Sequence, residues 1–332
     1  MSDITKGRLQ EFEALRGLSI VLLLALHSEV FDPSFFGEGS GPLAGLIASF
    51  LLGSFFFLAG YFTEFSIQKK TNLFSFVKSK IIRIFPPYWL ALLLFVYGIG
   101  YTLKRNDFAV YLLNLQAVFS PVFVKPLLTL WYISMLVVFY IIFCTLLFTI
   151  KSNVKLLISS VFVFLLAYIA NVSIGLFDPR FFQYYFIFLF GVYFCRFDEI
   201  REKLFSFNFA SKIILAFITA IMMWLVESYP LTNLFYILIA DLFILTWIWM
   251  WLGIFRTQVG SWKVWALLST ASFFAYLFHR PLWFFLNQAL NIEEAWRQKV
   301  LFNLWVGSAL ALILGYFLQR GYDKLLVMLR LK

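Results

Sequence analysis

The stretch EALRGLSIVLLLALHSE, residues 13–29, decides the fold class. Ten residues separate Arg16 from His27, and Ser19 is the one polar residue among them. Such a run is typical of a membrane span, because about 20 consecutive apolar residues cross a hydrocarbon core of about 30 Å. Ionisable groups inside a span are costly, and their presence indicates function by default. The arginine and the histidine therefore need an explanation of their own.

Similar apolar runs recur along the whole chain. Its 332 residues are 62% hydrophobic and 13% charged, whereas a soluble domain has about 25% charged residues. We expect an all-α, polytopic membrane protein of about ten transmembrane helices, forming a single membrane-embedded domain over residues 1–332. The expected spans are 14–31, 43–66, 82–103, 126–150, 155–174, 180–196, 211–228, 231–254, 264–288 and 299–319. The piece 108–119 is too short to cross, and we expect it to lie in the interface or dip partway into the membrane.

Basic residues predict the orientation of the chain. With both termini in the cytoplasm, nineteen of the 27 lysines and arginines fall on the inside and six on the outside, while Arg16 and Arg280 lie in spans. This distribution follows the positive-inside rule. The net charge of +10 is thereby explained by topology, and we expect no nucleic-acid partner.

Motifs of soluble enzymes and metal sites are missing from the sequence. There is no Gly-rich phosphate loop, GxSxG elbow or Cys/His zinc spacing. His27 and His279 are 252 positions apart, so we expect no metal site and no permanently bound cofactor. Cys144 and Cys195 fall in or at the end of apolar runs, which argues against a disulfide framework.

Arg16 and His27 lie on one face of the first predicted helix. Eleven residues turn the helix about 20° past three full turns and raise it by about 16 Å. Arg16 would lie near the cytoplasmic end and His27 toward the outer half. Each residue also has a structural interpretation, in which Arg16 extends to the interface and His27 is a satisfied interior histidine.

A second group of cations opens the third span, in FVKSKIIRIFPPYW (residues 76–89). Lys78, Lys80 and Arg83 cluster at its cytoplasmic entrance, and we expect Pro86 and Pro87 to break or kink the start of the helix. The cluster either sets topology alone or binds a phosphate-rich cytosolic ligand.

Two further stretches place polar groups in apolar surroundings. ASFFAYLFHRPLWF (271–284) contains His279 and Arg280, and we expect Arg280 to face the bundle interior, a water-filled cleft or an anionic partner. Asp241 is the deepest acid, either a structural partner of a buried cation or a catalyst. LTLWYISMLVVFY (128–140) contains Trp131 and Ser134 and has the aromatic start typical of a membrane interface.

Together these stretches resemble the acyltransferase-3 family of integral membrane O-acyltransferases over nearly the whole chain. In the first span, Glu13, Arg16, Gly17 and His27 match an acidic-x-Leu-Arg-Gly segment followed by a histidine. The other matching segments are FFFLAGYF (55–62), KIIRIFPPYW (80–89), LWYIS (130–134) and AYLFHRPL (275–282). Lys80 stands where the family more often has arginine, and Met135 where many members carry glutamate.

The resemblance implies transfer of an acyl group, most often acetyl, from cytoplasmic acyl-CoA to a hydroxyl of a cell-surface or lipid-linked carbohydrate. It implies that His27 and Arg16 are catalytic, His27 as a general base or acyl carrier and Arg16 by orienting the donor phosphate or the thioester region. Lys80 and Arg83 would bind the donor together with Arg16. His279 or Arg280 would stabilise oxyanion charge, with Trp131, Ser134 and Asp241 in supporting places. We expect a stand-alone member without a fused periplasmic domain, in the bacterial inner membrane.

Two other classes of protein fit the bare residues. A transporter or flippase for an anionic lipid or sugar would use the same buried cations, although no internal repeat is visible. A structural membrane scaffold would tolerate the loss of Arg16 and Arg83. Oligomeric state, the acceptor and the choice between acetyl and another acyl group are left open.

Overall fold

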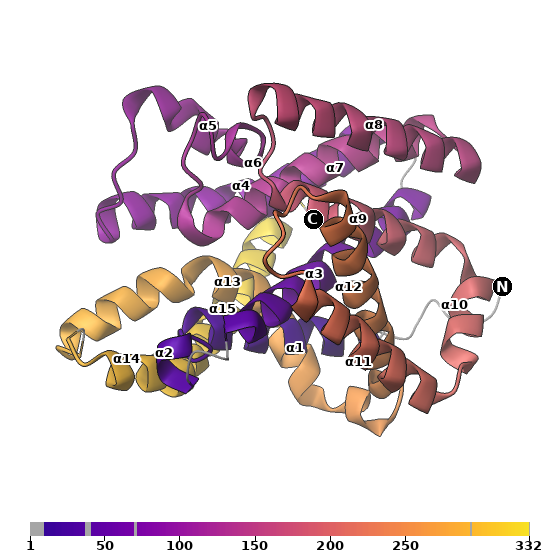
Figure 1. Ribbon diagram of the computed structural model, residues 1–332. Helices are drawn as coiled ribbons and strands as arrows, with labels where there is room; N and C mark the ends of the chain where they lie inside the picture. The colour runs from indigo at the N-terminus through magenta and orange to yellow at the C-terminus, as the bar shows by residue number, and fades with distance from the viewer. Residues whose placement is uncertain (1–9, 37–40, 70–71, 293, 332) are drawn as a thin grey trace. The chain divides into compact units, whose positions relative to one another are not determined.

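The computed structural model describes residues 10–36, 41–69, 72–292 and 294–331, and over these residues it is helical without strands (Figure 1). Each of the ten apolar runs forms a helix. The helices are α1 (Gln10–His27), α3 (Gly41–Lys69), α4 (Leu73–Leu93), α7 (Trp131–Thr149), α8 (Asn153–Ile174), α9 (Arg180–Arg196), α11 (Phe209–Leu225), α12 (Leu234–Phe255), α13 (Lys263–Ala289) and α15 (Ser308–Met328). α15 is preceded by α14 (Trp296–Phe302) and the π-helix η6 (Asn303–Gly307).

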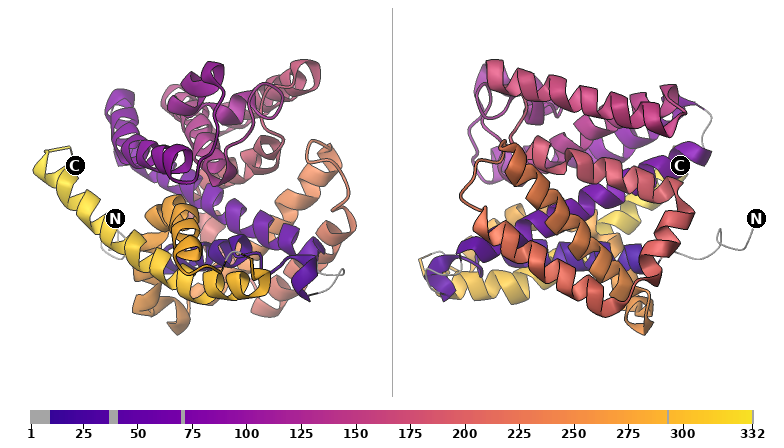
Figure 2. Two further views of the ribbon diagram at one scale, coloured as in Figure 1. Left: turned by 90° about the vertical axis from the view of Figure 1, so that its left-hand side faces the viewer. Right: turned by 45° about the vertical axis from the view of Figure 1, so that its right-hand side comes forward.

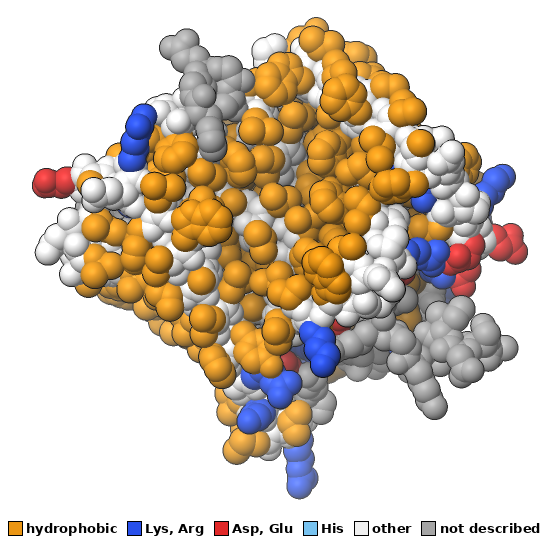
Figure 3. Space-filling view, turned by 90° about the horizontal axis from the view of Figure 1, so that it is seen from below, with side chains coloured by type: hydrophobic (Ala, Val, Ile, Leu, Met, Phe, Trp, Pro, Cys, Tyr) orange, Lys and Arg blue, Asp and Glu red, His pale blue; other side chains and the backbone are white. Residues whose placement is uncertain are grey.

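Six helical segments in the described ranges are long and apolar enough to cross a membrane. A bent pair, α10 (Asp198–Ser206) and α11, would make a seventh, with a bend of 95°. Apolar side chains cover most of the face seen in Figure 3. The chain is therefore a multi-pass helical membrane protein. Of the residues assigned to the cytoplasmic side, Lys6, Arg8, Lys70 and Lys332 lie outside the described residues.

The helices group into two compact units. Unit 1 contains residues 1–55, 202–228 and 242–332, and unit 2 contains residues 56–201 and 229–241. The division passes through α3, α10 and α12, so these helices contribute to both units.

In unit 1, α13 packs against both α1 and α15 (Figures 1 and 2). Small residues permit this close packing, as is common between membrane helices. A Cβ added to Gly17 of α1 would lie 3.0 Å from the ring of Trp265, and one added to Gly315 of α15 would lie 2.7 Å from the carbonyl oxygen of Ala271. The helix that carries His279 is thus enclosed on two sides.

A charged cluster at the bend between α10 and α11 also belongs to unit 1. Arg256 pairs with Glu202 at 2.9 Å and lies 3.7 Å from Glu11 of α1, while its guanidinium stacks on Phe205. The buried ammonium of Lys212 donates to the Phe205 carbonyl at 3.1 Å. These bonds satisfy the carbonyl end of α10 and hold the bend.

In unit 2, α7 forms the centre and contacts α4, α8 and α9. Its inner side is completely buried and aromatic, with Phe139 and Phe143 packed on Phe188 of α9. A partly buried ion pair between Glu64 of α3 and Arg196 of α9, at 2.8 Å, joins α3 to α9.

The tandem prolines do not break their helix, which excludes one of the two outcomes expected from the sequence, a break or a kink. α4 starts at Leu73, nine residues before the predicted span, because the side chain of Asn72 caps it by accepting from the Phe74 N–H. Pro86 and Pro87 therefore lie inside a continuous helix, and the same helix includes Lys78 and Lys80, which precede the predicted span.

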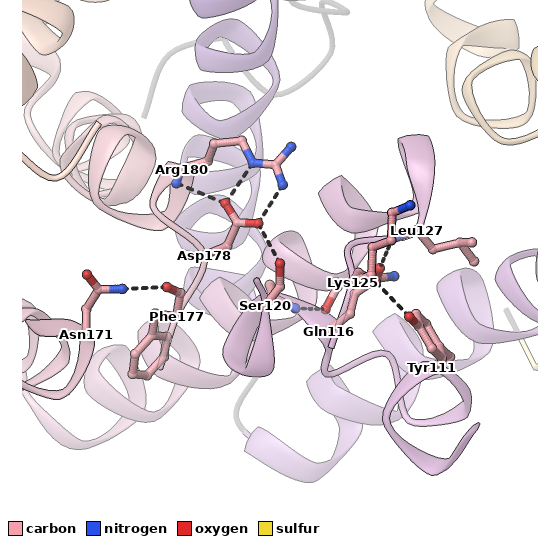
Figure 4. A network of polar contacts seen from close by, with 11 residues as sticks. Tyr111, Gln116, Ser120, Lys125, Leu127, Asn171, Phe177, Asp178 and Arg180 are labelled. Atoms are coloured by element: carbon pink, nitrogen blue, oxygen red, sulfur yellow. Dashed lines mark hydrogen bonds and ion pairs between the residues drawn. The ribbon is translucent and has the colours of Figure 1, made fainter. Parts of the chain in front are cut away.

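The short piece 108–119 forms two small helices, α5 (Phe108–Leu112) and α6 (Gln116–Phe119), neither of which could cross a membrane. Side chains fix the loops around them (Figure 4). Tyr111 donates to the Lys125 carbonyl at 2.7 Å, and burial raises its pKa to about 12, so the phenol stays protonated. Asp178 accepts from Ser120 and Arg180 and anchors the start of α9.

The packing predicts that alanine substitution lowers the stability of the protein at one glycine and not at another. Gly191→Ala should lower the melting temperature of the detergent-solubilised protein, because an added Cβ would overlap the carbonyl oxygen of Phe57 where α3 and α9 cross. Overpacking of this kind costs about 1–3 kcal/mol. Gly321→Ala on α15 is the matched control, since nothing lies within 4 Å of its Cβ position. Equal melting temperatures for the two variants would contradict the crossing.

Candidate active site

The structure brings together the two histidines of the chain. His27 is the last residue of α1, and His279 lies in the buried part of α13. Nδ1 of His27 is 2.8 Å from Nε2 of His279. The two rings are nearly parallel, with an interplanar angle of 9° and centroids 4.9 Å apart. This arrangement lets an N–H of one ring point at the lone pair of the other.

Neighbouring carbonyls determine which nitrogen carries each proton. Nδ1 of His279 lies 2.8 Å from the carbonyl oxygen of Tyr276 and 3.1 Å from that of Ala275. Carbonyl oxygens accept and cannot donate, so Nδ1 of neutral His279 carries the hydrogen and its Nε2 is an acceptor. Nδ1 of His27 must then donate to that Nε2. The remaining nitrogen, Nε2 of His27, presents a lone pair.

The two rings differ in access. His279 is fully buried, and the indole of Trp283 packs edge-on against it at 5.1 Å. His27 is half-buried at the point where α1 ends, with Glu29 in a left-handed conformation two residues on (φ 71°). His27 is therefore the member of the pair that a substrate can approach, and His279 supports it from behind.

Arg280 follows His279 on α13 and is half-buried. Its Nε is buried without a hydrogen-bond partner in the described chain, and Glu29 is close enough to interact with it electrostatically. Arg16 is half-buried on α1, as is Glu13 one turn before it. Arg16, His27, His279 and Arg280 all belong to unit 1.

The other residues singled out from the sequence lie in unit 2. Lys80 is half-buried, with its ammonium over the rings of Tyr140 at 4.3 Å and Phe76 at 5.2 Å, and Arg83 is exposed. Asp241 is buried in α12, and its Oδ1 has no hydrogen-bond partner among the described residues. A common site for these groups and the histidine pair stays a prediction.

Trp131 and Ser134 have structural contacts at the start of α7. The Ser134 hydroxyl accepts from the Ala117 N–H at 2.9 Å and donates to the Asn114 carbonyl at 2.7 Å, which ties the α5–α6 loop to α7. The guanidinium of Arg180 lies 3.6 Å above the Trp131 ring.

Asp178 and Arg180 were not singled out from the sequence, although they form part of the polar network of Figure 4. Their signal was the Asp-Pro-Arg spacing directly before an apolar run. Within the described ranges, no group of three or more His, Cys, Asp or Glu side chains could hold a metal ion.

The fold and this site define a multi-pass membrane protein with a histidine pair in its helical bundle. The family model described as an acyltransferase domain, that of the acyltransferase-3 family, matches residues 9–320. The chain therefore belongs to this family of membrane acyltransferases, as the sequence motifs indicated. Searches among curated proteins and among solved structures found no match.

The proton arrangement can be tested by chemical modification. Diethyl pyrocarbonate, applied to the protein without a histidine tag, should modify His27 at its free Nε2 and leave His279 unmodified. Both ring nitrogens of His279 are hydrogen-bonded, and the ring is fully buried. Mass spectrometry of peptides counts the modified rings, and His27→Ala supplies the control without a reactive histidine. Equal labelling of both histidines would contradict the pairing.

Proposed function

We propose that this protein is an O-acyltransferase that moves an acyl group, acetyl in the first instance, from cytoplasmic acyl-CoA to a hydroxyl of a cell-surface or lipid-linked carbohydrate. Membership of the family carries the acyl-transfer chemistry. The observation that carries the assignment of the site is the hydrogen bond between His27 and His279, which leaves one accessible lone pair at the end of α1.

His27 acts as the general base. Its Nε2 takes the proton of the acceptor hydroxyl while the hydroxyl oxygen attacks the thioester carbonyl carbon. The carbon–sulfur bond then breaks, and the CoA thiolate leaves and recovers the proton from His27. General-base assistance of this kind is worth about 10²–10⁴-fold in rate.

His279 is a positioning residue in this scheme. Because its own Nδ1–H is bonded to carbonyls of the α13 backbone, it presents a fixed acceptor to His27. That acceptor keeps the His27 proton on Nδ1 and directs Nε2 outward. The same logic orients the base of a catalytic triad, in which a neighbouring acceptor selects the tautomer.

Lys80, Arg83 and Arg16 would bind the phosphates of the donor. Their charges suit a polyanionic ligand, and the half-buried ammonium of Lys80 is held between aromatic rings. Lysine offers a point charge where arginine would offer a bidentate fork. Arg280 would stabilise the oxyanion that develops on the thioester carbonyl.

The proposed topology has ten spans with both termini in the cytoplasm, in a bacterial inner membrane. The positive-inside count supports this orientation. It places Arg16, Lys80 and Arg83 on the side where CoA is found. His27 then lies about 16 Å further along α1, toward the side of an external acceptor.

Loss of the base should abolish transfer. In His27→Ala, acetylation of surface glycans should fall by at least about 10²-fold while the protein is inserted at normal abundance. His279→Ala should fall similarly, and His279→Gln should recover part of the rate because its amide oxygen can still accept from His27. Mass spectrometry of glycans from cells with each variant gives the measurement. Full acetylation by His27→Ala would remove His27 from the mechanism.

The transporter alternative makes a different prediction in the same system. A transporter or flippase moves its cargo without a covalent change, so label from radioactive acetyl-CoA would not become bound to any glycan. Wild-type membranes that incorporate no label, with the protein folded and inserted, would favour that alternative.

Removal of donor-side charge should weaken donor binding without changing the chemical step. We expect Lys80→Ala to raise the KM for acetyl-CoA about tenfold with little change in kcat, as for loss of one charge-assisted hydrogen bond. Lys78→Ala is the matched control, because this exposed lysine lies two residues away and on another face of α4. Titration of acetyl-CoA in membrane vesicles measures both constants. An unchanged KM in Lys80→Ala would exclude Lys80 from the donor site.

A further inference from the structure

Next to the histidine pair, α13 carries a stripe of buried polar atoms that the proposed mechanism does not use. Arg280, Trp283 and Asn287 lie at positions i, i+3 and i+7, within about 60° of one another around the helix. Nε of Arg280, Nε1 of Trp283 and Oδ1 of Asn287 are buried and have no hydrogen-bond partner in the described chain. Trp283 and Asn287 are more than nine-tenths buried.

The helix opposite this stripe contributes a fourth such atom, Oδ1 of Asn303 in the π-helix η6, where Asn303 is 5% exposed. A Cβ on Gly315 would lie 3.0 Å from Cβ of Ala275, and a Cβ on Gly307 would lie 2.7 Å from Nε1 of Trp283. From the first contact to the second, the residue number rises by eight on α13, from 275 to 283, and falls by eight on the opposite helix, from 315 to 307. The two helices are therefore antiparallel.

Four residues further along each helix are Asn287 on α13 and Asn303 at the start of η6. Extended by this turn, the register predicts that Asn303 lies opposite Asn287, so that the two amides and the indole form one patch. The edge-on contact between Trp283 and His279, at 5.1 Å, connects the patch to the histidine pair.

The chemistry of the patch indicates its ligand. Buried polar atoms without partners are costly and rare in folded proteins, and π-helices are frequent at functional sites. The guanidinium and the indole N–H are donors, and the two amide oxygens are acceptors. A hydroxyl both donates and accepts, so a molecule with several hydroxyls can satisfy all four atoms. An acyl chain satisfies none of them, and a phosphate leaves the two amide oxygens unpaired.

We infer that Arg280, Trp283, Asn287 and Asn303 form the acceptor subsite and bind the hydroxyls of a neutral sugar beside His27. The inference rests on the proposed function and adds the residues that select the acceptor. In the proposed topology this end of α13 faces outward. Glu29 lies beside it and accepts from the indole of Trp296 at 3.2 Å, which adds a carboxylate and an aromatic ring of the kind that sugar sites use.

The test uses reconstituted full-length protein with radiolabelled acetyl-CoA as donor. The acceptor is the glycan fraction extracted from envelopes of cells that lack the protein. Asn287→Leu and Asn303→Leu remove the amides and retain a similar side-chain volume. Each should raise the KM for the glycan about tenfold, the effect of one lost hydrogen bond to a hydroxyl, while the KM for acetyl-CoA is unchanged. Gln288→Leu, an exposed amide on the next residue of α13, is the matched control.

The outcomes separate the inference from the proposed function. If the wild type labels the glycan and both leucine variants keep its acceptor KM, the subsite is wrong and the enzyme assignment stands. If the wild type labels no glycan, the proposed function itself fails. Melting temperatures distinguish a folding defect from lost recognition, and Trp283→Phe supplies a variant that keeps the ring and removes one donor. An acceptor KM unchanged in Trp283→Phe as well would overturn the inference.

Discussion

The hydrogen bond between His27 and His279 depends on how closely α1 approaches α13. The two helices run in the same direction, and Gly17 of α1 lies against Trp265 and Leu268 ten residues before His27, about 15 Å along the helix. A side chain at position 17 would press on both residues and force them to shift. A 2.8 Å bond between rings tolerates little displacement, because hydrogen bonds weaken steeply with distance and angle. The pairing of the histidines at the end of α1 therefore depends on a glycine in the middle of the same helix.

Hydrogen bonds between neutral groups also lower the energetic cost of placing these polar side chains in an apolar bundle. Backbone carbonyls accept from His279, His279 accepts from His27, and one lone pair remains for a substrate. An isolated charge in such surroundings would be expensive, whereas neutral imidazoles with satisfied nitrogens are not. The base can therefore exist in the membrane without a buried carboxylate beside it.

Hydropathy predicted the helices, and it failed where a helix carries charge. Lys78, Lys80 and Arg83 lower the apolar signal, so the predicted span began nine residues after the true start of α4. Lysine and arginine are nevertheless good helix formers, and the Asn72 cap starts the helix before them. Similarly, Arg196 and Arg256 contributed to the topology count, but each also forms an ion pair with glutamate. A count of charges contains no information on partners.

In the candidate site, too, the sequence predicted features within one helix but not the contacts between distant residues. Helical spacing was sufficient to predict that Arg16 and His27 share a face, and the family motifs marked His279. The pairing of residues 252 positions apart follows instead from the contacts of glycines along α1 and α15 with α13. The hydrophobic periodicity of the sequence does not predict how these helices are aligned along one another.

The alignment of α15 with α13 affects the proposed recognition of the donor and of the acceptor differently. Phosphates of a CoA donor can be attracted over several ångströms by cations, and a lysine serves nearly as well as an arginine for that purpose. Hydroxyls must be recognised by atoms within about 3 Å, and a site that leaves such atoms unpaired rejects ligands that lack the matching group. In the proposed scheme, a shift of α15 relative to α13 would therefore leave donor binding by Lys80 unaffected and would alter which acceptor is used. Selection of the acceptor would depend on the packing of Gly307 and Gly315 against α13, as the placement of the proposed base would depend on Gly17.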